Sequence, residues 1–167
     1  MTKINLLLTA ILTILYVSCL SQNSNITDTI QFKVKGDYSK FEPLVLESVN
    51  LLLKSPINEN SNNLTNLKAI QFMMKWMEGT PDYQFNIDES MVKATKSNKS
   101  LLGVFLASMV KYCIENKTTE IKSIKYNSFL VFLKYCEDSK NNVKLDKELK
   151  SLIKAKDNNS LKAYLKI

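Results

Sequence analysis

The sequence predicts an all-α protein, built as a single irregular helical bundle or as a short helical-hairpin solenoid of five to seven helices. After Tyr38, apolar residues recur with the spacing of one helix face in one segment after another. The segment 99–115 is apolar around almost its whole circumference, which requires neighbouring helices on every side. The connections between these segments are short. We therefore expect one helical domain at residues 38–167.

The first expected helix covers residues 42–54. Pro43 suits the first helical position, because the N–H group that proline lacks has no intrahelical partner there. Ser55-Pro56 ends this helix, since the residue before a proline disfavours helical backbone angles. An Asn-rich loop follows.

The second expected helix covers residues 63–78, and Gly79 followed by Pro81 marks its end. We expect Gly79 to adopt a left-handed backbone conformation, which glycine tolerates at helix ends. A short helix at 88–96 follows, with Asp88 as its N-cap. The apolar face of the second helix is expected to comprise Leu67, Ile70, Met74 and Met77.

The remaining helices are expected to enclose the core segment 99–115. Thr118 or Thr119 is the expected N-cap of the first of them. These helices are expected to span residues 120–138, 144–156 and 160–166.

Residues 1–21 have the layout of an export signal. Lys3 precedes an apolar run, Ile4–Val17, and small and polar residues follow. As a helix this run would be about 21 Å long, short of the roughly 30 Å hydrocarbon core of a bilayer. We therefore expect a cleaved signal rather than a permanent membrane span.

Two cleavage sites remain open. Val17-Ser18-Cys19 resembles a lipobox, in which the cysteine becomes the lipidated first residue, although a tyrosine stands three positions before it where an aliphatic residue is usual. The other site lies after Ser21. Residues 22–37 are polar and suit a tether between a membrane anchor and the fold. The protein is thus expected to be exported, either anchored in the bacterial cell envelope through Cys19 or free in the periplasm or outside the cell.

The composition excludes several kinds of site. All 23 basic residues are lysine, so the chain lacks the arginine fork that reads guanine and clamps phosphate, and we expect no nucleic-acid partner. Without histidine there is no Ser-His-Asp triad and no histidine metal site. Cys113 and Cys136 lie in apolar segments and form no Cys-x-x-Cys pair, so we expect neither a metal nor another cofactor.

The positive charge belongs to the C-terminal part of the chain. Residues 111–167 hold thirteen lysines and seven acids, a net charge of +6, whereas residues 22–110 hold nine of each. A solvated surface is the ordinary interpretation. A Lys-rich surface that binds anionic lipid or polysaccharide is the functional alternative.

The segment from Trp76 to Phe85 is the densest local pattern, with three aromatic residues, two acids, Gly and Pro in ten positions. Together with Phe41-Glu42-Pro43-Leu44 and Ala69-Ile70-Gln71-Phe72, it resembles a group of small, uncharacterised exported bacterial proteins. In that group a helix ends in a Trp-Met-x-Gly-Thr-Pro-Asp-Tyr turn. The resemblance covers residues 38–88 and implies no activity.

Two interpretations of this turn stay open. As a binding site, Trp76, Tyr83 and Phe85 would stack on a ligand or anchor a partner, with Glu78 and Asp82 as polar contacts. As a structural element, the turn would be a helix end that its aromatic side chains cover.

We favour a non-enzymatic interaction module of the cell envelope, with a protein or another envelope ligand as its partner and no catalytic residues. Such a module would show an exposed apolar or aromatic groove and no carboxylates of perturbed pKa. The enzymatic alternative is a hydrolase with paired carboxylates that acts on a glycan or another envelope substrate. It would require a cleft with two acids, at least one of raised pKa. Its candidate residues are Glu78, Asp82, Asp88 and Glu89.

Overall fold

The structure is a computed structural model that describes residues 30–56 and 64–167. The chain divides into two compact units, Met1–Gln31 and Phe32–Ile167, and the fold described below is that of the second unit. The expected export signal and Cys19 lie outside the described residues. Within the described ranges the all-α prediction is confirmed, because they contain seven α-helices, one short 3-10 helix and no strand.

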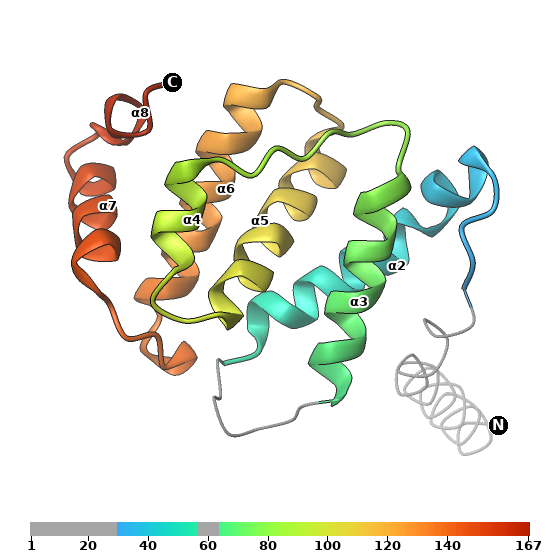
Figure 1. The fold of residues 1–167 in the computed structure, drawn as a ribbon, viewed down its shortest axis with the longest axis horizontal. Coiled ribbons are helices and arrows are strands. Elements are labelled where there is room, and N and C mark those ends of the chain that lie inside the picture. Colours follow the sequence, from blue (N-terminus) through green and yellow to red (C-terminus); the bar gives the residue numbers. More distant parts are fainter. Residues whose placement is uncertain (1–29, 57–63) are drawn as a thin grey trace, which may run out of the picture. The chain divides into compact units, whose positions relative to one another are not determined.

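The helices form a bundle around α5, which packs against α2, α3, α4 and α6. Figure 1 shows α5 in yellow in the middle of these helices, with α7 beside α4 and α6 and with α8 next to α7. The elements are α2 (Lys35–Lys54), α3 (Leu64–Gly79), α4 (Glu89–Thr95), α5 (Ser100–Asn116), α6 (Ile121–Glu137), η1 (Ser139–Asn141), α7 (Lys147–Asp157) and α8 (Leu161–Tyr164).

Helix α5 is the centre of the core, as its apolar circumference predicts. Ten of its residues are buried, a number that only a helix surrounded by others can reach. The ring of Phe105 meets two rings of α6, Phe129 and Phe132, at centroid distances of 4.8 and 5.0 Å. The edge-to-face geometry of the first pair is one that aromatic rings favour in protein cores.

Helix α2 begins at Lys35, earlier than the expected start at residue 42, and it takes in the last residues of the expected tether. The Asp37 carboxylate supports this start, because it accepts hydrogen bonds from the backbone N–H groups of Lys33 and Val34 at 2.8 and 3.0 Å. Pro43 therefore lies inside the helix. Proline removes one backbone hydrogen bond and clashes with the preceding turn, and α2 changes direction in this region (Figure 1).

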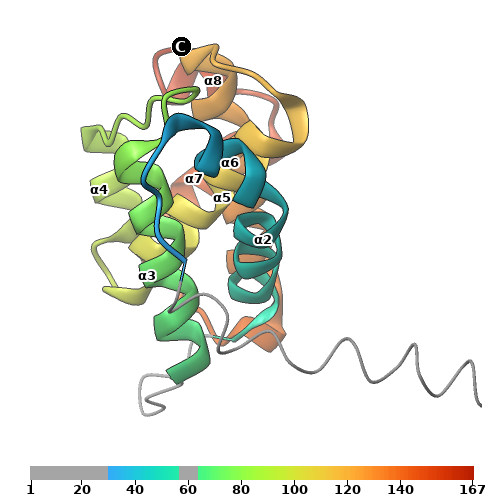
Figure 2. The ribbon, with the colours of Figure 1, turned by 90° about the vertical axis from the view of Figure 1, so that its right-hand side faces the viewer.

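Helix α3 buries a different face from the one that its apolar spacing predicts. Leu67 and Met74 of the expected face are exposed, while Ile70 lies against Gly103 of α5. Figure 2 shows α3 alongside α2, the helix that it contacts most. Apolar residues lie on more than one side of α3, so periodicity alone did not identify the side that α2 covers. The buried residues are Ala69, Phe72, Met73 and Trp76.

The helix caps agree with the sequence at one of the two expected positions. Asp88 caps α4 as expected, because its carboxylate accepts hydrogen bonds from the N–H groups of Ser90 and Met91. Helix α6 is capped by Glu120 instead of Thr118 or Thr119. The carboxylate of Glu120 reaches backbone N–H groups in the first turn of α6 that have no partner within the helix.

Candidate functional site

The turn after α3 is built around Trp76, whose indole is fully buried. Its Nε1–H donates a hydrogen bond to the backbone carbonyl of Tyr38 in α2, at 3.1 Å. The rings of Tyr83 and Phe85 lie 5.7 and 6.0 Å from the indole, between centroids. This burial fits the structural interpretation of the turn, because the indole offers no surface to a ligand.

Gly79 does not adopt the expected left-handed conformation, since no glycine in the described residues has a positive φ. Its role is to allow a close approach. A Cβ atom at this position would lie 2.7 Å from Cζ of Tyr38 and closer still to the tyrosine hydroxyl oxygen. The Tyr38 ring thus packs directly onto the bare backbone at the end of α3.

The other residues of the expected binding turn divide between surface and interior. Glu78 and Asp82 are exposed, Phe85 is half-buried and Tyr83 is buried. The Asp82 carboxylate accepts a hydrogen bond from the Ser39 hydroxyl of α2, at 3.3 Å. The binding interpretation of this turn stays a prediction, and the side chains that it could use from outside are the two acids and part of one ring.

The buried Tyr83 faces an ion pair between two helices. Its pKa is raised by burial and by the neighbouring carboxylate of Glu42. Glu42 is itself largely buried and pairs with Lys117, at the end of α5. The hydrogen bond from Lys117 to the Glu42 carboxylate raises the pKa of the lysine, so the ammonium group stays charged at neutral pH. The pair connects α2 to the end of α5.

The two remaining candidate acids, Asp88 and Glu89, line a cleft of about 390 Å³ among α4, α6, α7 and α8. Glu78 and Asp82 do not line it. Six side chains of the cleft carry charge, three negative and three positive. They are Asp88, Glu89, Glu148, Lys93, Lys125 and Lys166.

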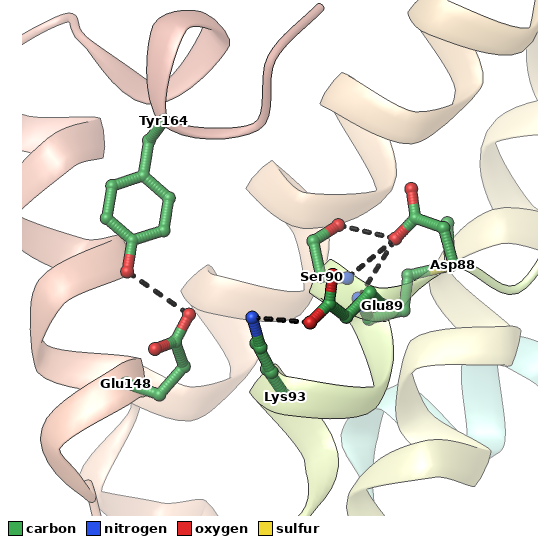
Figure 3. A network of polar contacts seen from close by, with 7 residues as sticks. Asp88, Glu89, Ser90, Lys93, Glu148 and Tyr164 are labelled. Atoms are coloured by element: carbon green, nitrogen blue, oxygen red, sulfur yellow. Dashed lines mark hydrogen bonds and ion pairs between the residues drawn. The ribbon is translucent and has the colours of Figure 1, made fainter.

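Hydrogen bonds and ion pairs hold the walls of this cleft (Figure 3). On the α4 side, Lys93 pairs with Glu89 at 2.7 Å. On the opposite side, the hydroxyl of Tyr164 in α8 donates to Oε1 of Glu148 in α7, at 3.1 Å. Burial and the adjacent Glu148 carboxylate both raise the pKa of this tyrosine.

Lys125 of α6 lies at the inner end of the cleft and ties three elements together. Its Nζ lies 2.7 Å from Oδ2 of Asp88 and donates a second hydrogen bond to the carbonyl of Leu165, at 3.0 Å. Asp88 and Lys125 also line a smaller apolar pocket of about 40 Å³, next to Met91 and Met109. The ion pair thus fixes the start of α4 against α6 and the end of α8.

The acids of the α4 wall are held in the ionised form. The hydrogen bond from Lys93 lowers the pKa of Glu89. Burial raises the pKa of Asp88, but hydrogen bonds from Lys125 and Ser90 outweigh burial and hold the pKa below its ordinary value. Neither acid therefore has the raised pKa that a general acid needs at neutral pH.

Sequence reasoning missed the residues that complete this cleft, namely Lys125, Glu148 and Tyr164. They come from three different helices, and no local motif connects them to Asp88. The signals in the sequence were the expected helix cap at Asp88 and the neighbouring acids Asp88 and Glu89, which placed one wall but not the side chains opposite.

Metal and thiol chemistry have little support in the described part of the chain. No three acidic or cysteine side chains among the described residues are grouped so that they could hold a metal ion. Cys113 and Cys136 are both buried and free, and burial raises the pKa of each thiol to about 12. Such thiols are unreactive at neutral pH.

Several lysines of the basic C-terminal part are bound by acids. Lys111, Lys117 and Lys156 each form an ion pair with a glutamate, as Lys125 does with Asp88. These pairs neutralise part of the positive charge locally. Lys111 pairs with an acid of its own helix, and the other three lysines pair with an acid of another element.

Comparison with known proteins gives no match, whether to a family model, to a curated protein or to a solved structure. The class that the structure defines is thus an all-α helical bundle. No helix in residues 30–56 and 64–167 combines the length and the apolar character needed to cross a membrane.

Proposed function

We propose that this chain is a non-enzymatic interaction module of the bacterial cell envelope that binds a partner through the outer face of α3. We use this name for the exposed side chains of Leu64, Leu67 and Met74. The observation that supports the proposal is their exposure, 62%, 52% and 42% respectively, on a helix whose opposite side is buried in the bundle.

The spacing of these residues indicates the kind of partner. The outer face of α3 follows steps of three and four residues through the exposed Gln71. This is the spacing of the seam between two packed helices, in which a residue of one helix fits between residues of the other. The partner is thus an amphipathic helix of another envelope protein. Burying a leucine or methionine side chain contributes roughly 1.5–3 kcal/mol.

The alternatives have weaker support. The cleft holds two of the candidate acids of a hydrolase, but the pKa values of Asp88 and Glu89 are lowered, so neither is a proton donor at neutral pH. The Lys-rich surface loses charge to ion pairs. Binding through the outer face of α3 depends neither on the pKa of an acid nor on unpaired lysine charge.

We expect a photo-crosslinking residue at position 71 to capture one discrete partner in living cells of the source organism. Leu67→Glu and Met74→Glu should each reduce the captured adduct at least about tenfold, because a buried unpaired carboxylate removes more than the roughly 1.4 kcal/mol that a tenfold change requires. Immunoblotting of the irradiated envelope fraction measures the adduct.

Ile121→Glu is the matched control, because Ile121 is 52% exposed, as Leu67 is, but lies at the start of α6. It should leave the adduct unchanged. Equal adduct from all three variants, or no discrete adduct from position 71, would contradict binding through the outer face of α3.

The envelope location is part of the proposal and has its own test. We expect Cys19→Ala to release the mature protein from the membrane fraction, because only a lipidated cysteine would hold it there. Mass spectrometry of the native protein should then show a chain that starts at Cys19 with acyl groups. A membrane-bound Cys19→Ala variant, or recovery of a chain that still begins at Met1, would contradict the anchor.

A further inference from the structure

The α7–α8 side of the cleft has one carboxylate oxygen without a hydrogen-bond partner. The Tyr164 hydroxyl donates to Oε1 of Glu148, and Oε2 of Glu148 has no partner among the described residues. Tyr164 is 42% exposed and lines the same cleft. A carboxylate oxygen without a partner suits an ammonium group, which gains a charge-assisted hydrogen bond there.

The other side of the cleft presents ammonium groups. Figure 3 shows the Lys93 ammonium bonded to Glu89 on the side of α4 that faces Glu148. Lys166 also lines the cleft and forms no ion pair with another described residue. Its charge contributes to the lowered pKa of Glu89. Two ammonium groups that line the same cleft suit a carboxylate ligand group.

The balance of charge indicates the class of ligand. Three acids and three lysines line the cleft, so a ligand with a net charge of either sign would meet repulsion from one set. A molecule that carries one ammonium and one carboxylate group satisfies both sides. The volume of about 390 Å³ lies at the small end of the range for ligand sites, which suits a molecule of amino-acid size.

We propose that this cleft binds a zwitterionic α-amino acid, with its ammonium group on Glu148 and its carboxylate on Lys93 and Lys166. This site is separate from the outer face of α3, so each stands or falls without the other. The amino acid is bound and not transformed.

The test is an NMR titration of the 15N-labelled full chain with glycine, L-alanine, L-glutamate and L-lysine. At least one should shift the backbone amide signals of Ser90, Lys93, Glu148 and Tyr164, and these shifts should saturate below about 20 mM, as expected for millimolar affinity. The same amino acid with an acetylated amine, or with an amidated carboxyl group, should bind at least about tenfold more weakly, because each lacks one of the two charges.

Variants identify the site. Glu148→Gln keeps an acceptor for the Tyr164 hydroxyl, so the wall should stay folded, yet it should weaken binding of the amino acid at least about tenfold. Lys93→Gln should do the same. Glu78→Gln, which removes an exposed acid of α3 outside the cleft, should have no effect.

Several outcomes would overturn the proposal. They are no saturable shift with any of the four amino acids, equal affinity for the zwitterion and its blocked forms, and unchanged affinity in Glu148→Gln with an intact amide spectrum. Saturable shifts confined to signals outside the cleft would also overturn it.

Discussion

Trp76→Ala should lower the free energy of unfolding by about 3–5 kcal/mol, the range measured for large aromatic residues removed from a core. The indole is fully buried, and its loss leaves a cavity between Tyr83 and Phe85 that the helix end cannot close. The change also leaves the Tyr38 carbonyl without its indole donor. Urea denaturation followed by circular dichroism at the helical band measures this loss.

Trp76→Phe separates the two contributions. Phenylalanine keeps much of the apolar volume but has no N–H group, so it should cost only about 0.5–1.5 kcal/mol, the net contribution of one hydrogen bond. A loss below about 1 kcal/mol in Trp76→Ala would contradict the structural interpretation of the turn. If such a stable variant also lost the captured partner, the turn itself would be the binding site.

The sequence predicted the existence and approximate bounds of most helices because those features depend on local spacing. The core position of α5 follows from an apolar circumference that leaves no side for solvent. The end of α3 follows from Gly79 and Pro81. Each of these inferences needs only residues that are close together in the chain.

Features that depend on contacts between helices were predicted less well. The spacing of Leu67 and Met74 marks an apolar stripe on α3, but α2 covers the opposite side. Pro43 resembled a helix start because a proline there costs nothing, while the Asp37 cap earlier in the chain began the helix. In both cases the local pattern allowed two solutions, and packing chose between them.

The cleft shows the same limit for a candidate site. Asp88 and Glu89 were candidates as acids close in sequence, and the structure separates them from Glu78 and Asp82. Their new neighbours, Lys125 and Glu148, come from α6 and α7. These neighbours affect the chemistry, because burial raises the pKa of Asp88 and the hydrogen bond from Lys125 helps to lower it below its ordinary value.

The glycine at the end of α3 leads to the second large expected effect. Gly79→Ala should destabilise the protein by about 1–2 kcal/mol, although alanine is normally the better helix residue by about 0.5–1 kcal/mol. The new Cβ must displace the Tyr38 ring, which stacks on Phe32 at a centroid distance of 4.8 Å. Gly36→Ala is the matched control in α2. A Cβ there meets no atom within 4 Å, so the same substitution should stabilise.

The same substitution made in a Tyr38→Ala protein tests whether the Tyr38 ring causes the destabilisation. In Tyr38→Ala the obstacle is gone, so adding Gly79→Ala should be neutral or stabilising by up to about 1 kcal/mol. The sign of the effect thus reverses between the two backgrounds, and the coupling energy of the double-mutant cycle should reach about 1–3 kcal/mol. Equal destabilisation in both backgrounds would show that Gly79 is required for a reason other than the Tyr38 ring. If the effect of Gly79→Ala changes sign between the two backgrounds, packing of the Tyr38 ring on the Gly79 backbone holds the first turns of α2 against the end of α3.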